Sequence, residues 1–311
     1  MKTILLSFAF CFSLFVLGQN QIASEEKLLM NDSIQLPGTL TYTSELKTQP
    51  LVIFVQGSGN PDRNGNQPAM GVNINYIKLL RDKLNKNGIA FYSYDKRNVT
   101  KENMPYLLKS FVFDDLVTDV TTAIDAFKND ERFSYITLIG HSQGSLVAML
   151  AVNENVDKFV SLAGLGEPVD LALTRQITAQ SAQLGEKTKA HFKELKETGE
   201  IKNVDPLLIS IFAKQNLPFF KNYIKYNPAE VIKTLTIPAL VINGKKDIQV
   251  LVNDANLLHA AKPDSELVII DKMNHVLKII EKDSDNLASY TSPNFPLSEE
   301  LVTVISNFVK Q

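Results

Sequence analysis

Residues 135–150 read "YITLIGHSQGSLVAML" and place a serine at a polar corner between two apolar segments. Ser142 lies between Gly140 and Gly144, in the pattern Gly-x-Ser-x-Gly. Glycine and serine are also common in tight turns, so the pattern alone is consistent with an ordinary turn. Between a buried strand and a helix, however, such a corner strains the backbone and exposes the serine hydroxyl. We therefore interpret Ser142 as the candidate nucleophile.

A serine hydroxyl is a weak nucleophile at neutral pH, so it needs a general base and a third group that orients the base. The chain has four histidines. His275, in "IIDKMNHV", follows the last apolar strand pattern, where sites of parallel sheets assemble. His141 is expected to pack beside the corner, and His191 and His259 to be structural or exposed on helices. His275 is the candidate base.

The orienting acid is chosen by the same placement argument. Asp247 closes "VINGKKD", directly after an apolar strand pattern, and Asp271 lies at the end of the next one. Asp254 and Asp264 fall on a predicted helix and in a turn. We predict that Asp247 orients His275, with Asp271 as the weaker competitor.

A glycine-rich loop, "QGSGNPDRNGNQP", follows the first apolar strand. Acyl transfer places negative charge on a carbonyl oxygen, which two preorganised backbone N–H groups stabilise. We predict that these oxyanion-hole donors are Ser58 and Gln143, with Gly57 permitting a close approach. A plain glycine turn is the alternative, whereas neither phosphate-binding glycine spacing is present. Asp62 and Arg63 are expected to form an ion pair that fixes the loop.

Strand and helix patterns alternate along the chain, which favours an α/β fold with a mostly parallel, doubly wound sheet. A short antiparallel pair is expected within 32–43, turning at Pro37 and Gly38. The six predicted core strands are 51–55, 89–95, 135–140, 159–164, 237–244 and 266–271, and the main helices are 75–88, 114–130, 145–154, 253–261 and 297–310.

Residues 166–236 interrupt this alternation, because they contain helical patterns and no convincing strand. An insertion after the fourth core strand leaves the sheet at the edge where ligands bind. We therefore predict a helical cap at 166–236, between core segments 19–165 and 237–311. The following aromatic residues of this segment suggest an apolar pocket, with packing inside the cap as the alternative: Phe212, Phe219, Phe220, Tyr223 and Tyr226.

The first 18 residues have the pattern of a secretory signal peptide. Lys2 precedes an uncharged apolar run that is short for a membrane span, and a plausible cleavage point is Gly18–Gln19. We expect export, to the periplasm or the medium, without a stable membrane anchor; an uncleaved anchor is the alternative. Cys11, the one cysteine of the chain, lies in this segment, so the mature protein is expected to have no disulfide.

The composition is that of an ordinary globular protein. The 311 residues are 44% hydrophobic and 21% charged, with a formal net charge of -2. A charge this close to zero gives no reason to expect nucleic acid as a partner.

The order Ser142, Asp247, His275, placed at three strand ends, resembles the α/β-hydrolase superfamily. Within it, the chain is similar to secreted or periplasmic bacterial serine esterases. The likeness extends from "LVIFVQGSG" to the last helix and includes "GSGNPDRNGN", "YDKR", "GHSQGS", "NGKKD" and "MNH". The pattern departs in two places: Gln56 stands where histidine is usual, and "RNVTKEN" replaces a glycine-containing segment. Residues 95–97, the "DKR" of "YDKR", are expected to be structural, although they border the site.

This resemblance implies an exported serine hydrolase that cleaves small-molecule carboxylic esters through an acyl-enzyme, with no metal or cofactor. The first alternative is a serine peptidase or amidase on the same fold. The second is a non-catalytic binding protein on a hydrolase scaffold, which the presence of all three candidate triad residues disfavours. The acyl and alcohol specificity and the oligomeric state are left open.

Overall fold

The computed structural model describes residues 21–311. The predicted signal peptide, with Cys11 and the Gly18–Gln19 cleavage point, lies outside the described residues. Within 21–311, every helix is too short or too polar to cross a membrane.

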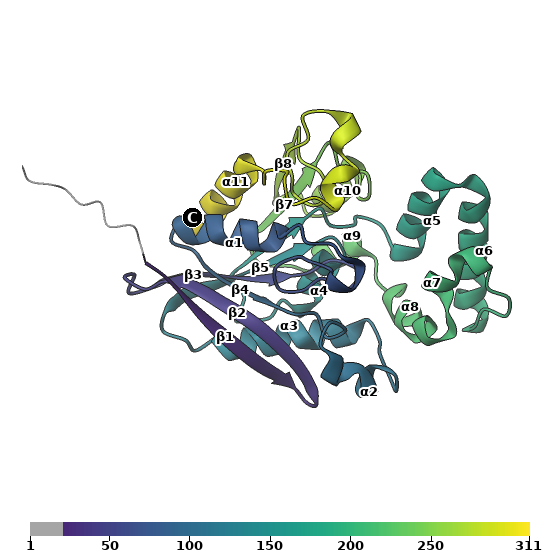
Figure 1. Cartoon of the computed structure of the whole chain (residues 1–311), viewed down its shortest axis with the longest axis horizontal. Coiled ribbons are helices and arrows are strands. Elements are labelled where there is room, and N and C mark those ends of the chain that lie inside the picture. Colours follow the sequence, from purple (N-terminus) through teal and green to yellow (C-terminus); the bar gives the residue numbers. More distant parts are fainter. Residues whose placement is uncertain (1–20) are drawn as a thin grey trace, which may run out of the picture.

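The described part of the chain is built around one eight-stranded sheet with the order β1-β2-β4-β3-β5-β6-β7-β8 (Figure 1). Strands β3 to β8 run parallel to one another, and β1 and β2 join them as an antiparallel pair. The predicted mostly parallel α/β sheet is therefore confirmed. The strands are β1 (Ile22–Asn31), β2 (Ile34–Thr43), β3 (Gln49–Val55), β4 (Ala90–Tyr94), β5 (Phe133–His141), β6 (Lys158–Leu162), β7 (Ala239–Gly244) and β8 (Glu266–Ile270).

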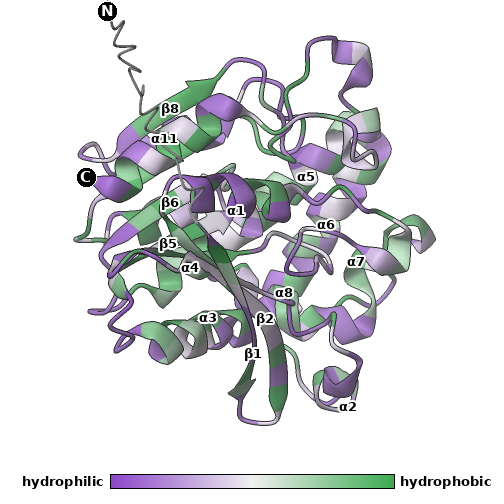
Figure 2. Ribbon diagram, turned by 60° about the vertical axis from the view of Figure 1, so that its left-hand side comes forward, coloured by the Kyte–Doolittle hydropathy of each residue, from purple (hydrophilic) through white to green (hydrophobic). Residues whose placement is uncertain are grey.

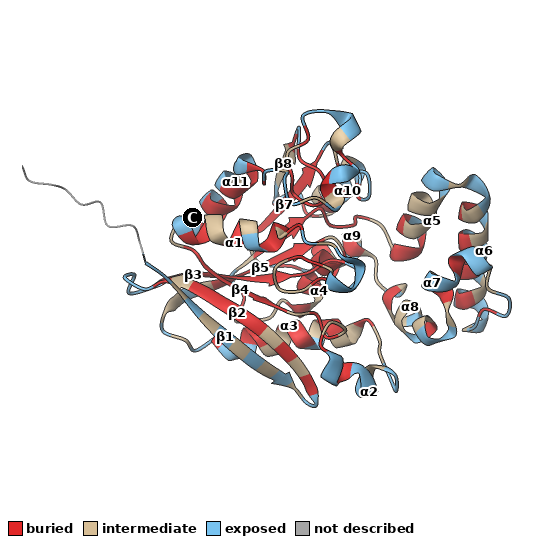
Figure 3. Ribbon diagram, in the orientation of Figure 1, coloured by how far each residue is buried: buried red, intermediate tan, exposed pale blue. Residues whose placement is uncertain are grey.

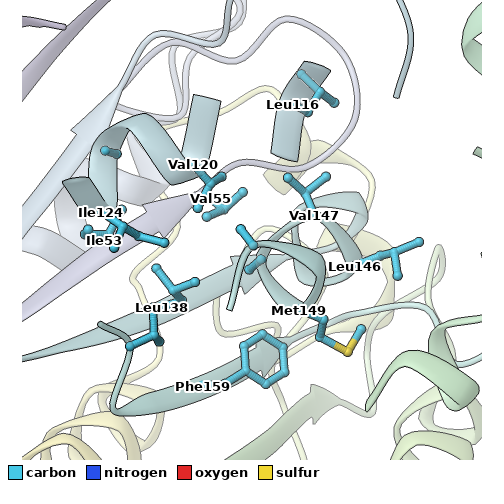
Figure 4. Close-up of a cluster of buried hydrophobic side chains, with 14 of the residues drawn as sticks. Ile53, Val55, Leu116, Val120, Ile124, Leu138, Leu146, Val147, Met149 and Phe159 are labelled. Carbon is cyan, nitrogen blue, oxygen red and sulfur yellow. The ribbon is translucent and has the colours of Figure 1, made fainter. Parts of the chain in front are cut away.

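Helices cover both faces of the sheet, because successive residues of the apolar core strands point to opposite faces. In β3, Ile53 and Val55 join the apolar cluster that contains α3 and α4, whereas Val52 and Phe54 join the cluster of α1 and α11. Figure 4 shows the first of these clusters. The core helices are α1 (Tyr76–Lys86), α3 (Asp114–Phe127), α4 (Gln143–Ala151), α10 (Val252–Ala261) and α11 (Glu299–Lys310), and the short α2 (Met104–Leu107) precedes α3.

The hydropathy and the burial of the residues agree with this layering. In Figure 2, hydrophobic and hydrophilic residues alternate along α3 and α11, as expected for helices that bury one face. In Figure 3, the central strands are buried, whereas β1 is half-buried or exposed along its length. An edge strand of this kind lacks a clean apolar alternation, which explains why the sequence patterns did not predict β1.

The predicted turn at Pro37 and Gly38 is wrong. The antiparallel pair exists, but it is β1 and β2, and it turns at Asp32–Ser33, where Asp32 has a φ of 51°. Gly38 lies inside β2 because the Tyr92 ring packs directly on it: a Cβ at Gly38 would lie 2.3 Å from the Tyr92 hydroxyl oxygen. The glycine therefore permits a close contact within the sheet rather than a reversal of the chain.

Between β6 and β7 the chain forms five α-helices and adds no strand to the sheet. Helices α5 to α8 lie to one side of the sheet in Figure 1, whereas α9 packs against the core helices α4 and α10. Part of this segment has its own apolar cluster, formed by residues such as Phe192 and Phe212. The segment is also tied to the core, since Asn222 and Tyr226 donate hydrogen bonds to Asp114 of α3. The helices are α5 (Val169–Gln180), α6 (Ala182–Thr198), α7 (Ile209–Phe212), α8 (Leu217–Tyr223) and α9 (Pro228–Ile232).

Candidate active site

Ser142 occupies a strained corner between β5 and α4. Its φ of 55° and ψ of -124° are unusual for a residue with a side chain, and such strain is typical of functional sites. Both flanking glycines are required by close packing. A Cβ at Gly140 would lie 2.4 Å from the Gly144 carbonyl oxygen, and one at Gly144 would lie 2.2 Å from the Val55 carbonyl oxygen. The motif therefore reflects this corner geometry and not only a tight turn.

His275 and Asp247 are hydrogen-bonded to each other. His275 Nδ1 lies 2.8 Å from Asp247 Oδ2, and both side chains are buried. Asp247 Oδ1 accepts the backbone N–H groups of Gln249 and Val250 at 2.8 and 2.9 Å, which fixes the carboxylate. In the tautomer where Nδ1 carries the proton, Nε2 of His275 is free to accept one.

Asp271, the competing acid, is not part of this hydrogen-bonded pair. Its carboxylate pairs with Lys245 Nζ at 2.7 Å, its side chain is 76% exposed, and the pairing lowers its pKa. Among the other histidines, His191 accepts a backbone N–H from Asp205, and His259 bonds to Ser265.

Ser142 and His275 line the same small cavity, of about 120 Å³, together with Gly57 and Ser58. The structure thus brings all three predicted triad residues to the carboxyl edge of the sheet. Within residues 21–311, no hydrogen bond links Ser142 Oγ to His275. Long nucleophile–base contacts are common in proteins without bound substrate.

The two predicted oxyanion donors flank Ser142. The backbone N–H of Ser58 has no acceptor within residues 21–311. Gln143 is the first residue of α4, so its N–H has no partner within the helix. The loop approaches closely because Gly57 lacks a side chain: a Cβ there would lie 3.0 Å from Ser142 Cβ.

A larger pocket of about 350 Å³ opens from Ser142 and Gln143 toward the helices of 166–236. Phe219, Phe220 and Tyr223 line it, as the sequence suggested. Phe212 does not line it and is fully buried in the apolar cluster of α6 and α8, while Tyr226 bonds to Asp114. Helical spacing could not separate these two groups, because the same pattern serves a packed core and a pocket wall.

Solved structures with a similar fold include esterases of low sequence identity. The Pyrococcus furiosus esterase Pf2001 has a TM-score of 0.60 and is 16% identical, over 93% of this chain and 90% of that chain. Est1E from Butyrivibrio proteoclasticus has a TM-score of 0.57 and is 17% identical, over 92% of this chain and 96% of that chain. A family model described as serine aminopeptidase, S33, matches residues 70–206, which contain the Ser142 corner. The chain has the α/β-hydrolase fold.

Among curated proteins, this chain is similar to esterase EstD of Thermotoga maritima. The two are 25% identical over 250 residues, which are 78% of this chain and 58% of EstD. The chain therefore spans less than two thirds of the length of this relative.

The loop after β3 makes contacts that differ in part from those expected. Asp62 and Arg63 do not pair with each other: Asp62 Oδ1 accepts the backbone N–H groups of Asn64 and Asn66, each at 2.8 Å. A carboxylate that closes its own turn in this way points away from its chain neighbour. Arg63 instead bonds to Asp95 Oδ2 at 2.8 Å. The expected ion pair is wrong, although both residues do fix the loop.

The two departures from the family pattern also have structural consequences. The Gln56 amide donates to the carbonyl of Tyr94, so it ties the end of β3 to the end of β4. In "RNVTKEN", Arg97 forms a buried pair with Asp119 at 2.7 Å, and Asn103 donates to the Arg97 carbonyl. Both segments are therefore held by internal contacts of this chain.

Lys96 is the residue of the site that the sequence patterns underestimated. As expected, it borders the large pocket, but its buried Nζ also donates to Gly57 O and Gln143 Oε1, which the sequence did not predict. Burial lowers the pKa of its ammonium to about 7, against the charge of Asp119, which raises it. The position directly after β4, at the carboxyl edge, was the available signal.

His141 packs beside the corner, as predicted, and also supports the base. Its Nε2 lies 2.8 Å from the backbone carbonyl oxygen of His275 and donates to it, and Tyr76 Oη lies 3.3 Å from its Nδ1. Burial, aided by the nearby charge of His275, lowers the pKa of His141 to about 3. His141 is therefore neutral at the pH at which His275 must act as a base.

This lowered pKa predicts a loss of stability in acid. The unfolded chain protonates His141 below its ordinary pKa of 6.5, whereas the folded chain does so only near 3. Stability from the neutral histidine is present above pH 6.5 and is lost as the pH falls from there toward 3. At about 1.4 kcal/mol per pKa unit, up to ~3 kcal/mol is lost between pH 7 and 4.

We expect His141→Gln, whose amide can still donate to the His275 carbonyl, to lose up to ~3 kcal/mol less than the parent protein over this range. Urea unfolding at pH 7 and pH 4 measures both losses. Equal losses in the two proteins would mean that His141 does not contribute to the acid sensitivity.

Proposed function

We propose that this protein is an exported serine hydrolase that cleaves small carboxylic esters through an acyl-enzyme. The observation that carries the proposal is the position of His275, which is hydrogen-bonded to Asp247 and lines the same cavity as Ser142, the serine at a strained corner. The similarity to EstD, a protein named as an esterase, supports the choice of esters.

In the proposed reaction, Ser142 Oγ attacks the ester carbonyl while His275 Nε2 takes its proton. The carbonyl oxygen becomes negative and is held by the N–H groups of Ser58 and Gln143. His275 then gives the proton to the leaving alcohol, and the acyl group stays on Ser142. His275 next takes a proton from water, whose oxygen attacks the acyl carbon. The bond between this carbon and Ser142 Oγ breaks, which releases the acid, and His275 returns the proton to Ser142 Oγ. Asp247 keeps the proton of His275 on Nδ1 throughout.

The charge of the pocket favours an ester over an aminopeptidase substrate. An aminopeptidase binds a substrate with a free ammonium group, which calls for a carboxylate nearby. Among the described residues that line the two cavities at Ser142 there is no aspartate or glutamate, and the charged side chain that borders the larger one is Lys96. This distribution disfavours a cationic substrate.

Two measurements test the proposal. The protein should hydrolyse p-nitrophenyl acetate or butyrate much faster than aminoacyl p-nitroanilides. It should also react with a fluorophosphonate at Ser142, located by mass spectrometry. Faster cleavage of the anilides would favour the peptidase alternative, and an unlabelled, inactive protein would favour the non-catalytic one.

We further propose that 166–236 acts as a cap that sets acyl specificity, because Phe219 and Phe220 line the large pocket. Burying a large side chain is worth ~1.5–3 kcal/mol. Phe219→Ala or Phe220→Ala should therefore lower kcat/KM for long-chain esters by about 10- to 100-fold, and less for acetate esters.

Phe133→Ala is the matched control, since Phe133 is also half-buried but lies on β5 outside the pocket. In Phe133→Ala, the ratio of kcat/KM for long-chain esters to kcat/KM for acetate esters should equal that of the parent protein. If the two cap variants lose equal activity on all chain lengths, Phe219 and Phe220 do not contact the acyl chain.

Export is part of the proposal and rests on the pattern of residues 1–18. Amino-terminal sequencing of protein from its native host should begin at or near Gln19. Membrane-bound material that retains Met1 would contradict cleavage.

A further inference from the structure

Lys96 joins the two segments that carry the proposed oxyanion donors. It lies two residues after the end of β4 and is buried. Its Nζ donates to the carbonyl oxygen of Gly57 at 2.8 Å and to the side-chain oxygen of Gln143 at 2.9 Å. One ammonium therefore spans from the loop after β3 to the first residue of α4.

The bond to Gly57 acts on the donor itself. The Gly57 carbonyl and the Ser58 N–H belong to the same peptide group. The positive Lys96 ammonium, which donates to the carbonyl oxygen, therefore pulls electron density from the N–H. Hydrogen bonds that share a group in this way strengthen each other. The contact with Lys96 also fixes the plane of the peptide, and hence the direction of the Ser58 N–H.

The bond to Gln143 acts on the second donor. Holding the side-chain amide restrains the residue whose backbone N–H lies at the start of α4. The segments of both donors are therefore held by the same charged atom, Lys96 Nζ, which fixes the distance between the two N–H groups. Oxyanion stabilisation depends on such preorganisation, because donors that must rearrange during the reaction lose their advantage.

A purely structural role explains Lys96 less well. Lys262, another buried lysine, also donates to a backbone carbonyl, that of Leu235, but it has a carboxylate partner in Asp264 at 2.8 Å. Within residues 21–311, no carboxylate lies within 4.0 Å of Lys96 Nζ. Burying an ammonium without an opposite charge beside it is unfavourable for folding.

We propose that Lys96 is a positioning residue that orients and polarises the two oxyanion donors, Ser58 and Gln143. The inference rests on the proposed serine-hydrolase function. Lys96 acts through the donors, so it should stabilise the transition state more than the bound ester.

The test is Lys96→Met, which keeps most of the length of the side chain and removes the charge, with Lys262→Met as the matched control. Removing one oxyanion donor typically costs ~10²–10³ in kcat. Because Lys96→Met leaves the donors present but less well held, we expect kcat on p-nitrophenyl butyrate to fall by about 10- to 100-fold, with KM changed less than about threefold. Lys262→Met should keep the parent kcat.

A transition-state analogue gives a readout that a general packing defect would not reproduce. Ser142 Oγ adds to the carbonyl of a trifluoromethyl ketone and forms a hemiketal whose oxyanion occupies the same hole. Its inhibition constant should rise in Lys96→Met by the same factor as kcat falls. Binding of butyrate, the product acid, should change little.

Chemical rescue keeps the inference testable if Lys96→Met folds poorly. Lys96→Ala lacks the atoms of n-propylammonium, so adding this cation should restore part of kcat in Lys96→Ala and not in Lys262→Ala. Failure of rescue together with a parent-like kcat in Lys96→Met would overturn the inference. So would a fall in kcat without a matching rise in the inhibition constant.

These outcomes are distinguishable from failure of the proposed function. If the parent protein hydrolyses esters, Ser142→Ala does not, and Lys96→Met equals the parent, the function stands and the role of Lys96 is wrong. If the parent protein neither hydrolyses esters nor binds the ketone, the function itself is wrong, and the inference falls with it.

Discussion

Ser142→Ala, His275→Ala and the double variant should all have nearly the same residual activity. Each single substitution is expected to lower kcat on p-nitrophenyl butyrate by on the order of 10⁴- to 10⁶-fold. The reason is that the serine is a useful nucleophile only when the base takes its proton, so removing either residue removes the same step. Substrate binding and the oxyanion donors remain, and they supply the residual rate.

The measurement is a comparison of purified proteins at equal concentration, with circular dichroism to verify that each is folded. His259→Ala is a suitable control, since His259 is on α10 and bonds to Ser265 rather than to the site. Losses that multiply in the double variant, or near-parent turnover in His275→Ala, would contradict the assignment of the pair.

Asp247→Asn should have the next largest effect, a loss of about 10³- to 10⁴-fold in kcat. An amide at this position can donate to Nδ1 of His275, which favours the tautomer with the proton on Nε2. That tautomer cannot accept the serine proton. The buried carboxylate, fixed by two backbone N–H groups, would be replaced with little change in volume, so the fold should survive.

Asp271→Asn is the matched control, because it makes the same chemical change at the end of the neighbouring strand. Its carboxylate is exposed and paired with Lys245, so the variant should keep parent activity. A pH–rate profile of kcat/KM for both variants completes the test. If Asp271→Asn proved far more damaging than Asp247→Asn, the acid of the triad would have to be reassigned.

The sequence by itself determined the six parallel core strands of the sheet and the order of the candidate residues along them. Apolar runs such as the one in β3 are buried on both faces and cannot be satisfied outside a covered parallel sheet. Parallel strands all end at the same edge, so residues that follow β5, β7 and β8 must meet there. This is why Ser142, Asp247 and His275 could be predicted from patterns within single segments.

The tertiary structure decided which side chains face each other at that edge. Asp247 and Asp271 both follow core strands, but the turn after β7 directs the first toward His275, and the second faces solvent. Lys96 contacts Gly57 and Gln143 across 39 and 47 residues of sequence. Apolar periodicity indicates which face of a helix or strand is buried. Contacts such as those of Lys96 depend on how separate loops pack against one another, so they cannot be predicted from the pattern of a single segment.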